Sequence, residues 1–373
     1  MTPSGPFDLV IVGAGIVGLA CARAALQRRW RVLVIDREAR AIGASIRNFG
    51  FVTVTGQPAG ATWRRAMRSR DVWAAICTEA RIPVLQRGLW LLAHRQEAVD
   101  VLAAFVRTEM GDGLETMSPA CAAAREPALR TEDARAAVFS PHELRIEPRE
   151  AIPAVAAWLE ACGVAFLRDT AVVDVGPSKA VTTAGVVQGA RIAVCPGPDL
   201  RTLFPALFRA RGVTLCKLQM LRVAARSPIA LSAPVMGDLS FVRYDGYAAL
   251  PAARALRAVL ETQCAAELRD GIHLIVVRSA DGSLVVGDSH HYDPSPDPFA
   301  PAGVEDRILA GMHRLVRVDG AQVVERWTGV YPSAAAPCFV DAPDPSIRVV
   351  SVTSGTGMST AFALGEEVVE AWR

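Results

Sequence analysis

Gly13-Ala14-Gly15-Ile16-Val17-Gly18 matches the pattern G-x-G-x-x-G, and it lies between an apolar run, Phe7–Val12, and an apolar helical pattern that begins at Leu19. The stretch therefore predicts a strand, a tight turn and a helix. In such a unit the first glycine permits the turn, the second lets the backbone approach a pyrophosphate, and the third lets helix and strand pack closely. The helix N-terminus supplies N–H groups and a positive dipole end. We interpret the stretch as a dinucleotide-binding turn.

A second apolar run, Arg31–Ile35, follows the predicted helix and ends at Asp36. An acidic side chain at the end of the second strand can accept hydrogen bonds from the ribose of an adenosine, and it disfavours a 2′-phosphate. This arrangement therefore argues against NADP at the site. The alternative to a dinucleotide-binding site is that Gly13–Gly18 is a glycine-rich turn that only connects a strand to a helix.

The C-terminal end of the chain repeats the same logic. Ser346–Val352 is typical of a buried strand, Ser354-Gly-Thr-Gly-Met358 of a turn, and the residues from Met358 onward of an amphipathic helix. The N–H groups of a second helix start can stabilise negative charge on the pyrimidine side of a reduced flavin, which a nicotinamide enzyme does not need. This end of the chain favours FAD over NAD, although an ordinary helix start remains the alternative.

The composition excludes several classes of function. Forty Lys plus Arg against 38 Asp plus Glu leave a formal net charge of +2, so no overall field attracts nucleic acid or an anionic membrane. The apolar run Leu9–Ala25 is too short and too glycine-rich to span a membrane. The eight cysteines are scattered, without metal-ligand spacing, and we expect mostly buried, reduced thiols in a cytoplasmic protein.

The middle of the chain predicts a second layer and a second domain. A Gly/Ser/Asn-rich stretch, Gly43–Gly60, interrupts the α/β pattern and is typical of a functional loop. A helix is expected over Ala151–Cys162, ended by Gly163, and several short strands follow up to Cys195. The segment from Gly212 to about Gln322 is strand-rich, with one helical stretch, Pro251–Leu268, and a rigid loop between Pro294 and Pro301.

With these elements in place, the chain resembles the D-amino-acid oxidase superfamily of FAD-dependent oxidoreductases, which includes glycine oxidase and monomeric sarcosine oxidase. The resemblance covers nearly the whole length and rests on Val10-Ile-Val-Gly-Ala-Gly-Ile-Val-Gly18, Asp36-Arg37, Ala44-Ser-Ile-Arg-Asn-Phe-Gly50, Val194-Cys-Pro-Gly197, Gly329-Val-Tyr-Pro332 and Ser354-Gly-Thr-Gly-Met358. A narrower resemblance, to a subgroup associated with aminophosphonate catabolism, rests on Arg47-Asn-Phe-Gly50, Cys216-Lys-Leu-Gln-Met220 and Gly287-Asp-Ser-His-His-Tyr292.

The resemblance implies an α/β fold, with a Rossmann-like FAD-binding domain of the glutathione-reductase type and a second, antiparallel-sheet substrate domain. The discontinuous FAD-binding domain would comprise residues 1–85, 140–211 and 322–373, and the substrate domain residues 86–139 and 212–321. Carried over by position, the FAD-binding residues would be Gly13, Gly15, Ile16, Val17, Gly18, Asp36, Arg37, Ser45, Arg47, Asn48, Gly50, Val172, Gly197, Gly329, Ser354, Gly355, Thr356, Gly357 and Met358. Among them, the loop from Ser45 would pass the flavin ring, the Val172 backbone would hold the adenine, and Gly197 would lie against the cofactor.

Two departures from the family pattern bear on function. The amino-acid oxidases carry G-x-R-P, in which the arginine binds the substrate carboxylate, whereas this chain has Tyr331 at the arginine position. Plain D-amino acids and glycine therefore become weaker candidates for the substrate. Sarcosine oxidases attach the flavin through a cysteine at the position of Gly329, so we expect non-covalent FAD here.

A phosphonate requires several hydrogen-bond donors, and seven side chains are candidates. They are Arg47, Lys217, Arg243, His290, His291, Arg326 and Tyr331, of which Arg47, Lys217, His290, His291 and Tyr331 are the predicted catalytic set. Each has a structural alternative. Arg47 could form a surface ion pair, and Lys217, on a strand with Gln219, could be solvated. The histidines could serve only structure, and Tyr331 could be a packing residue. Arg243, Tyr244 and Tyr247 form either a lid or a hydrated loop.

The predicted reaction is the oxidation of a small amine, of the N-methylated or 1-hydroxylated 2-aminoethylphosphonate type. A hydride would pass from the α-carbon to flavin N5, and water would hydrolyse the imine to an aldehyde. Oxygen or another carrier would take the electrons. The alternatives are an oxidase or dehydrogenase of glycine, sarcosine, a D-amino acid or a 2-hydroxy acid, a flavoprotein without enzymatic activity, and an NAD-dependent dehydrogenase.

Overall fold

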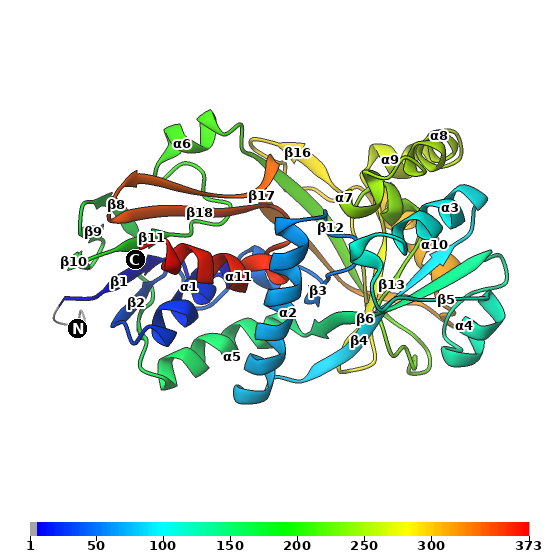
Figure 1. Ribbon diagram of the computed structural model, residues 1–373, viewed down its shortest axis with the longest axis horizontal. Helices are drawn as coiled ribbons and strands as arrows, with labels where there is room; N and C mark the ends of the chain where they lie inside the picture. The colour runs from blue at the N-terminus through cyan, green and yellow to red at the C-terminus, as the bar shows by residue number, and fades with distance from the viewer. Residues whose placement is uncertain (1–5, 373) are drawn as a thin grey trace.

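The computed structural model in Figure 1 describes residues 6–372. One mixed sheet of 15 strands runs through the molecule in the order β3-β6-β4-β13-β14-β15-β12-β17-β18-β11-β1-β2-β7, with β16 paired to β12 and β5 to β6. A separate sheet has the order β10-β9-β8. The fold is thus mixed α/β, as the sequence predicts.

One end of the large sheet, on the left of Figure 1, is a parallel layer, and the first glycine-rich turn follows its central strand β1. Its strands are β1 (Leu9–Val12), β2 (Val32–Ile35), β7 (Ala165–Leu167), β11 (Ile192–Val194) and β18 (Ile347–Ser354). The helices against it are α1 (Ile16–Gln27), α5 (Pro148–Ala161) and α11 (Gly357–Glu370), with α2 (Ala61–Glu79) packed on α11.

Alternation along β1 explains why this layer is covered on both faces. Leu9 and Ile11 belong to the core shared with α1, α5 and α11, whereas Val10 belongs to the core on the opposite face. That second core is closed by the short helix α6 (Pro205–Ala210) and by the small sheet of β8 (Val172–Gly176), β9 (Lys179–Thr182) and β10 (Gly185–Gln188). Because all three layers are apolar where they meet, β2 and β11 are buried along their whole length, whereas the edge strand β7 is half-buried.

The rest of the large sheet is mostly antiparallel. Its strands are β3 (Phe51–Val52), β4 (Val84–Ala93), β5 (Glu115–Met117), β6 (Ala136–Ile146), β12 (Thr214–Ala224), β13 (Val235–Met236), β14 (Ile275–Arg278), β15 (Leu284–Gly287), β16 (His291–Asp293) and β17 (Gln322–Asp344). The α-helices of this part are α3 (Gln96–Phe105), α4 (Pro119–Arg125), α7 (Asp245–Ala248), α8 (Ala253–Gln263), α9 (Ala265–Arg269) and α10 (Ala302–Leu315). The 3-10 turns are η1 (Ala44–Ile46), η2 (Glu109–Gly111) and η3 (Asp238–Val242).

The strand β17 joins the two ends of the sheet. Its first half pairs with β12 as far as Ser333, and its second half pairs with β18 from Ser333 onward. Since one continuous sheet contains both parts, the division into residues 1–85, 140–211 and 322–373 against 86–139 and 212–321 stays a prediction.

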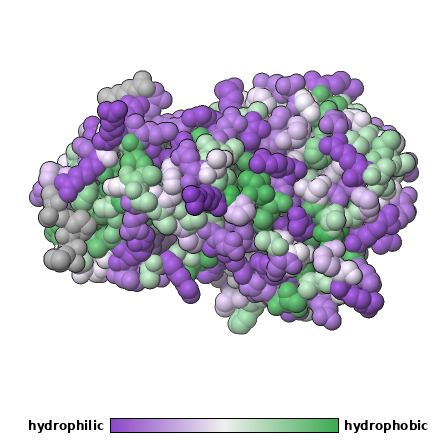
Figure 2. Space-filling model, turned by 90° about the horizontal axis from the view of Figure 1, so that it is seen from below, coloured by the Kyte–Doolittle hydropathy of each residue, from purple (hydrophilic) through white to green (hydrophobic). Residues whose placement is uncertain are grey.

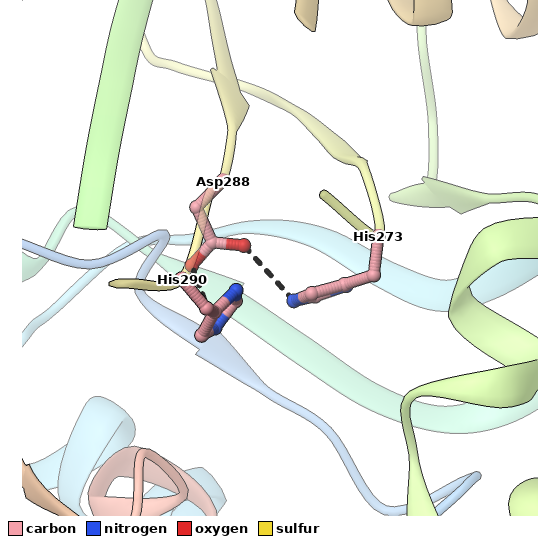
Figure 3. Close-up of side chains that lie close together, drawn as sticks. All are labelled: His273, Asp288 and His290. Atoms are coloured by element: carbon pink, nitrogen blue, oxygen red, sulfur yellow. Dashed lines mark ion pairs between the residues drawn. The ribbon is translucent and has the colours of Figure 1, made fainter. Parts of the chain in front are cut away.

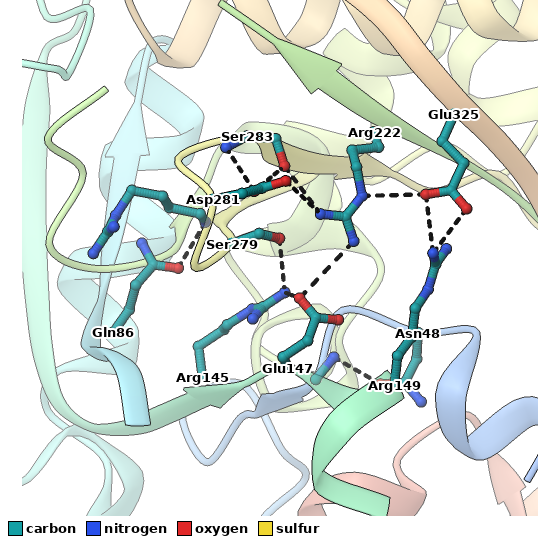
Figure 4. Close-up of polar contacts among 12 residues, drawn as sticks. Asn48, Gln86, Arg145, Glu147, Arg149, Arg222, Ser279, Asp281, Ser283 and Glu325 are labelled. Atoms are coloured by element: carbon teal, nitrogen blue, oxygen red, sulfur yellow. Dashed lines mark hydrogen bonds and ion pairs between the residues drawn. The ribbon is translucent and has the colours of Figure 1, made fainter. Parts of the chain in front are cut away.

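A network of charged side chains ties the start of α5 to β12 and β17 (Figure 4). Arg145 is fully buried, and its Nη2 lies 3.1 Å from Oε2 of Glu147. Arg222 lies 3.9 Å from the same carboxylate and 3.2 Å from that of Glu325. Arg149 donates to Glu325 at 2.7 Å. Burial lowers the pKa of Arg145 and the charge of Glu147 opposes this effect, so the network depends on keeping its carboxylates.

Several local expectations are confirmed, and one needs correction. Gly163 has a φ of +100°, as a left-handed helix end requires. The single helix expected over Pro251–Leu268 is wrong: the segment forms two helices, α8 and α9, which are separated at Cys264. The loop Gly43–Gly60 contains η1 and the short strand β3.

The surface and the cysteines complete the description. All eight cysteines are unpaired; five are buried, and Cys121 and Cys162 are exposed. Across residues 6–372 there is no helix with both the length and the apolar character that crossing a membrane requires. Figure 2 shows one face on which hydrophilic side chains predominate and hydrophobic ones gather in smaller patches.

Candidate active site

A cavity of about 320 Å³ lies between the parallel layer and the antiparallel part. Segments far apart in the sequence line it: Gly15–Gly18, the loop from Ala44 to Phe49, Gly329–Ala335 of β17, and Val350–Ser359. The two glycine-rich turns of the sequence therefore face the same space. This places the start of α1 and the start of α11 on one cavity wall.

The first and third glycines of the N-terminal motif are required by the fold itself. Gly13 has a φ of +103°, and a Cβ there would lie 2.3 Å from the carbonyl oxygen of Cys195. A Cβ on Gly18 would lie 1.9 Å from the carbonyl oxygen of Gly13. These contacts leave no room for a side chain, which agrees with the predicted roles in the turn and in helix packing.

The second glycine faces open space instead. A Cβ on Gly15 would meet only Ser45 Oγ, at 3.1 Å, and the residue has an ordinary φ of −73°. The adjacent N–H of Ile16 donates to Ser45 Oγ at 3.0 Å. The fold itself therefore does not require glycine at position 15. A ligand that approaches the backbone closely does require it, because a side chain would occupy the space. This cradle at the start of α1, with Val17 also at the cavity wall, fits a pyrophosphate.

Asp36 lies at the end of β2, beside the same turn. Its Oδ2 accepts a hydrogen bond from the N–H of Ala14 at 2.5 Å, and its backbone carbonyl accepts one from Thr170 at 3.0 Å. The second contact brings the start of β8, at Val172, next to the end of β2. Ala14 and Asp36 also line a second hollow of about 130 Å³, which lies beside the predicted ribose-binding carboxylate.

Two other predicted cofactor residues lie nearby without a defined role toward a ligand. Arg37 forms an ion pair with Asp199 on the surface. Gly197 lines the cavity and has a φ of +58°, and a Cβ added there would meet no heavy atom within 4 Å. The space beside Gly197 is therefore open to a ligand.

The loop from Ser45 to Gly50 is shaped by Asn48. The Asn48 amide donates to the carbonyls of Ala44 at 2.9 Å and Ser45 at 3.0 Å, and its Oδ1 accepts from the N–H of Gly50 at 2.7 Å. Gly50 has a φ of +64°, and a Cβ there would lie 1.9 Å from the carbonyl oxygen of Ile146. Both residues hold the loop in place, and of the two only Asn48 lines the cavity.

The C-terminal turn, Ser354–Met358, also forms part of the cavity wall. Ser354, Gly355, Thr356, Gly357 and Met358 all line the cavity. The Ser354 and Thr356 hydroxyls lie 2.7 Å apart, and α11 begins directly after them. The N–H groups at the start of this 14-residue helix are therefore available to the cavity.

The far wall carries a buried group of two histidines and one aspartate, drawn in Figure 3. His273 Nε2 lies 2.9 Å from Asp288 Oδ1, although that oxygen receives no well-directed hydrogen bond. His290 Nε2 lies 3.7 Å from Asp288 Oδ2, and His290 Nδ1 is 2.8 Å from the carbonyl oxygen of Gly271. The carbonyl fixes the ring, so Nε2 of His290 faces the carboxylate.

The protonation states of this group follow from burial and from neighbouring charge. Burial lowers the pKa of His290 to about 3, and the opposing charge of Asp288 does not reverse it. Burial alone would raise the pKa of Asp288, but His290, His273 and Arg243 outweigh it and hold that pKa below its ordinary value. At neutral pH, therefore, Asp288 is an anion and His290 is neutral.

Arg243 provides a cation on the same wall. Its Nη2 donates to the Tyr292 hydroxyl at 2.7 Å. Burial works to lower the pKa of Arg243, but Tyr292, Tyr331 and Asp288 hold it above its ordinary value. Burial raises the pKa of Tyr331 well above its ordinary value, so its phenol stays protonated. The cavity thus offers a guanidinium and two phenols as donors, with Arg47 at its edge, where Nη1 lies 3.4 Å from the carbonyl of Thr328.

Three of the candidates from the sequence do not reach the cavity. Lys217 Nζ donates to Asp297 at 2.9 Å and to the carbonyl of Phe299 at 2.8 Å. His291 pairs in register with Lys217 and is likewise not among the lining residues. Arg326 forms an ion pair with Glu305 at 2.6 Å.

Alternation along β12 explains the position of Lys217. Leu218 lines the cavity, so its neighbour Lys217 points to the opposite face of the sheet. Tyr247 is also a packing residue, because its ring lies 4.4 Å from that of Phe105 and 5.4 Å from that of Phe241. It is not part of a lid.

Sequence reasoning missed two residues of the buried group. Asp288 stands in the motif Gly287–Tyr292, and the apolar strand before it could have indicated a side chain at a strand end. His273 has no comparable signal, since it lies outside every motif and reaches Asp288 only through the fold.

Comparisons with known proteins agree with this geometry. A family model described as "FAD dependent oxidoreductase" matches residues 8–371. The chain is 22% identical to a glycine oxidase of Geobacillus kaustophilus (strain HTA426) over 342 residues, which are 87% of this chain and 81% of the relative.

Solved structures show the same fold. A crystal structure of glycine oxidase from Geobacillus kaustophilus superposes with a TM-score of 0.80 and 20% identity over 99% of this chain and 95% of that one. A crystal structure of L-proline dehydrogenase from P. horikoshii has a TM-score of 0.77 and 17% sequence identity, and the match covers 99% of this chain and 93% of that one. The structure of dithionite-reduced L-alpha-glycerophosphate oxidase from Mycoplasma pneumoniae, with FAD bound, has a TM-score of 0.74 and 15% sequence identity. The match covers 99% of this chain and 95% of that one. The family model covers nearly the whole chain, and the protein therefore belongs to the FAD-dependent oxidoreductase family, with FAD as its cofactor.

Proposed function

We propose that the protein oxidises a small amine that carries an oxyanion group, of the N-methylated or 1-hydroxylated 2-aminoethylphosphonate type. The observation that carries the proposal is Arg243, a half-buried cation that lines the cavity and is bonded to the Tyr292 hydroxyl, together with Tyr331 at the position where amino-acid oxidases carry an arginine. Three donors in one cavity suit an anion with three oxygens.

The cradle at the start of α1 is proposed to bind the FAD pyrophosphate through N–H groups at the start of that helix, with Asp36 at the adenosine ribose and the Val172 backbone at the adenine. The loop from Ser45 and the start of α11 would hold the flavin ring, without a covalent bond. Two observations support this assignment: the open space at Gly15, and the two helix starts on one cavity wall. When bound, FAD supplies the acceptor for a hydride from the α-carbon of the amine.

The remaining steps are the work of the chain's own residues. Arg243, Tyr292 and Tyr331 bind the oxyanion, so the carbon that bears the nitrogen is held toward the wall formed by α1 and α11. Desolvation in the cavity favours the neutral amine, the form that can be oxidised. Water then hydrolyses the resulting imine to an aldehyde. Oxygen or another carrier re-oxidises the cofactor, and we place the enzyme in phosphonate catabolism in the cytoplasm, in keeping with its unpaired cysteines.

A second candidate is the oxidation of an amino acid such as glycine, sarcosine or a D-amino acid, or of a 2-hydroxy acid. The guanidinium of Arg243 favours it as well, because it can bind a carboxylate through two parallel hydrogen bonds. The relative at 22% identity carries the name glycine oxidase.

Reduction of the purified flavoprotein without oxygen separates the two candidates. The panel comprises 2-aminoethylphosphonate, its N-methyl and 1-hydroxy forms, glycine, sarcosine, D-alanine and lactate, each added separately. We expect an aminophosphonate to bleach the visible flavin absorption fastest. Faster bleaching by glycine or D-alanine would favour the second candidate.

A further inference from the structure

The carboxylate of Asp288 is a buried anion to which neither a Lys nor an Arg among residues 6–372 is bonded. Asp288 is only 5% exposed, and its two nearest polar groups are the imidazoles of His273 and His290. Burial holds His290 in its neutral form at neutral pH, with a pKa of about 3. A buried charge normally keeps a counter-ion, because its transfer out of water is unfavourable. Among residues 6–372 no Lys or Arg lies within 4 Å of this carboxylate, so a cationic group of a ligand can serve as its partner.

Arg243 does not supply this charge through a direct contact. Its guanidinium bonds to Tyr292, and among residues 6–372 no ion pair of 4 Å or less joins it to Asp288. The titratable groups whose charges act on Asp288, or on which Asp288 acts, are His273, His290, Arg243, Tyr244, Tyr292 and Cys216. Arg243 is the one guanidinium among them, so the cavity holds a guanidinium and a carboxylate that are not bonded to each other.

We infer that Asp288 is the subsite for the ammonium group of a zwitterionic substrate, while Arg243 binds its oxyanion. The inference rests on the proposed function and goes beyond it by assigning the nitrogen-binding side chain. Asp288 suits this task because the residue lines the cavity, while its buried Oδ1 faces His273 without a well-directed hydrogen bond. His273 and His290 are positioning residues, which hold the carboxylate from two sides (Figure 3).

The same contact provides for the proton that the ammonium must lose. One N–H bond breaks and one O–H bond forms on Asp288, so an ion pair becomes a neutral amine beside a neutral carboxylic acid. No electrons are transferred in this step. Burial favours the neutral pair over two buried charges, and the amine is then in the form that can be oxidised.

The test compares two ligands that differ only at one atom position. 2-Aminoethylphosphonate carries the ammonium, and 2-hydroxyethylphosphonate carries a hydroxyl in its place. Binding of each to the oxygen-free holoenzyme is measured by calorimetry, in the wild type and in the variants Asp288→Asn and Arg243→Gln. Reduction of the flavin by the amine is recorded in the same samples across pH.

We expect Asp288→Asn to weaken binding of the amine roughly 10- to 100-fold, the range of a charge-assisted hydrogen bond, and to leave binding of the hydroxyl compound nearly unchanged. Arg243→Gln should weaken both. Retained binding of the hydroxyl compound also demonstrates that Asp288→Asn is folded. In that variant, reduction at saturating amine should require a higher pH than in the wild type.

Equal loss of both ligands in Asp288→Asn, or an unchanged preference for the amine, would overturn the assignment. A divalent metal that co-purifies in stoichiometric amount and whose removal by EDTA abolishes the preference would also overturn it, because the group in Figure 3 would then serve a metal. If no amine reduces the wild-type flavin, the proposed function fails, and the binding comparison still decides the role of Asp288.

Discussion

Arg243 donates a hydrogen bond to the Tyr292 hydroxyl at 2.7 Å, at the wall of a cavity whose other end is formed by two helix starts. A half-buried guanidinium with a phenol as its bonded partner keeps most of its donors free for a ligand. In the proposed function this guanidinium binds the acidic group of the substrate, since Tyr331 stands where amino-acid oxidases carry an arginine.

Arg243→Gln should raise the KM for the best amine substrate about 10- to 100-fold, since a hydrogen bond to a charged group contributes about 1.5–3 kcal/mol. Arg326→Gln is the matched control, because Arg326 is exposed and paired with Glu305. Steady-state kinetics on both variants provide the measurement. An equal KM in wild type and Arg243→Gln would remove Arg243 from the site.

The sequence predicts the cofactor end of the site well because its signals are local. The turns Gly13–Gly18 and Ser354–Met358 each lie between a strand and a helix and line one cavity, and Asp36 at the end of β2 is hydrogen-bonded to the first of them. The substrate wall is different. His273 and Asp288 meet only through the pairing of distant strands, and no pattern in the sequence fixes which face of β12 carries Lys217.

The long strand β17 also escapes the sequence analysis. It spans Gln322–Asp344 and contains Pro332 and Pro337, which interrupt the alternation that usually marks a strand. It forms because β12 and β18 offer pairing partners at its two ends. Tertiary structure here overrides local preference.

Gly15→Ala should fold and lose FAD, because the added methyl group meets only Ser45 Oγ and otherwise fills the cradle. Gly13→Ala should fail to fold, since its methyl group would lie 2.3 Å from a carbonyl oxygen at a φ of +103°. Flavin content and circular dichroism of the two purified proteins distinguish these outcomes. A Gly15→Ala protein with a full complement of FAD would contradict the assignment of the cradle.

His290→Gln should make stability less dependent on pH. The folded His290 has a pKa of about 3 against an ordinary 6.5, so between these values the unfolded chain binds a proton that the folded chain does not. The free energy of unfolding therefore falls as the pH falls through this window. Urea unfolding at pH 7, 6 and 5 should give a shallower decline for His290→Gln than for the wild type, and equal slopes would refute the buried neutral state.

Glu147→Gln should destabilise the protein by about 3–5 kcal/mol, the cost of leaving a buried charge unpaired. Arg145, its partner, has a side chain that is 0% exposed. Glu160→Gln breaks the exposed pair with Arg168, and we expect a loss of about 1 kcal/mol or less. Chemical unfolding of both variants measures the two free energies of unfolding. Equal decreases in this free energy would mean that the charged network in Figure 4 does not behave as a buried network.

Flavin reduction in the absence of oxygen tests the central claim most directly. The purified protein should be yellow, and an aminophosphonate should bleach it faster than glycine, sarcosine, D-alanine or lactate. A colourless protein that takes up no FAD, or a flavin that only a hydroxy acid reduces, would contradict the assignment of this cavity to amine oxidation.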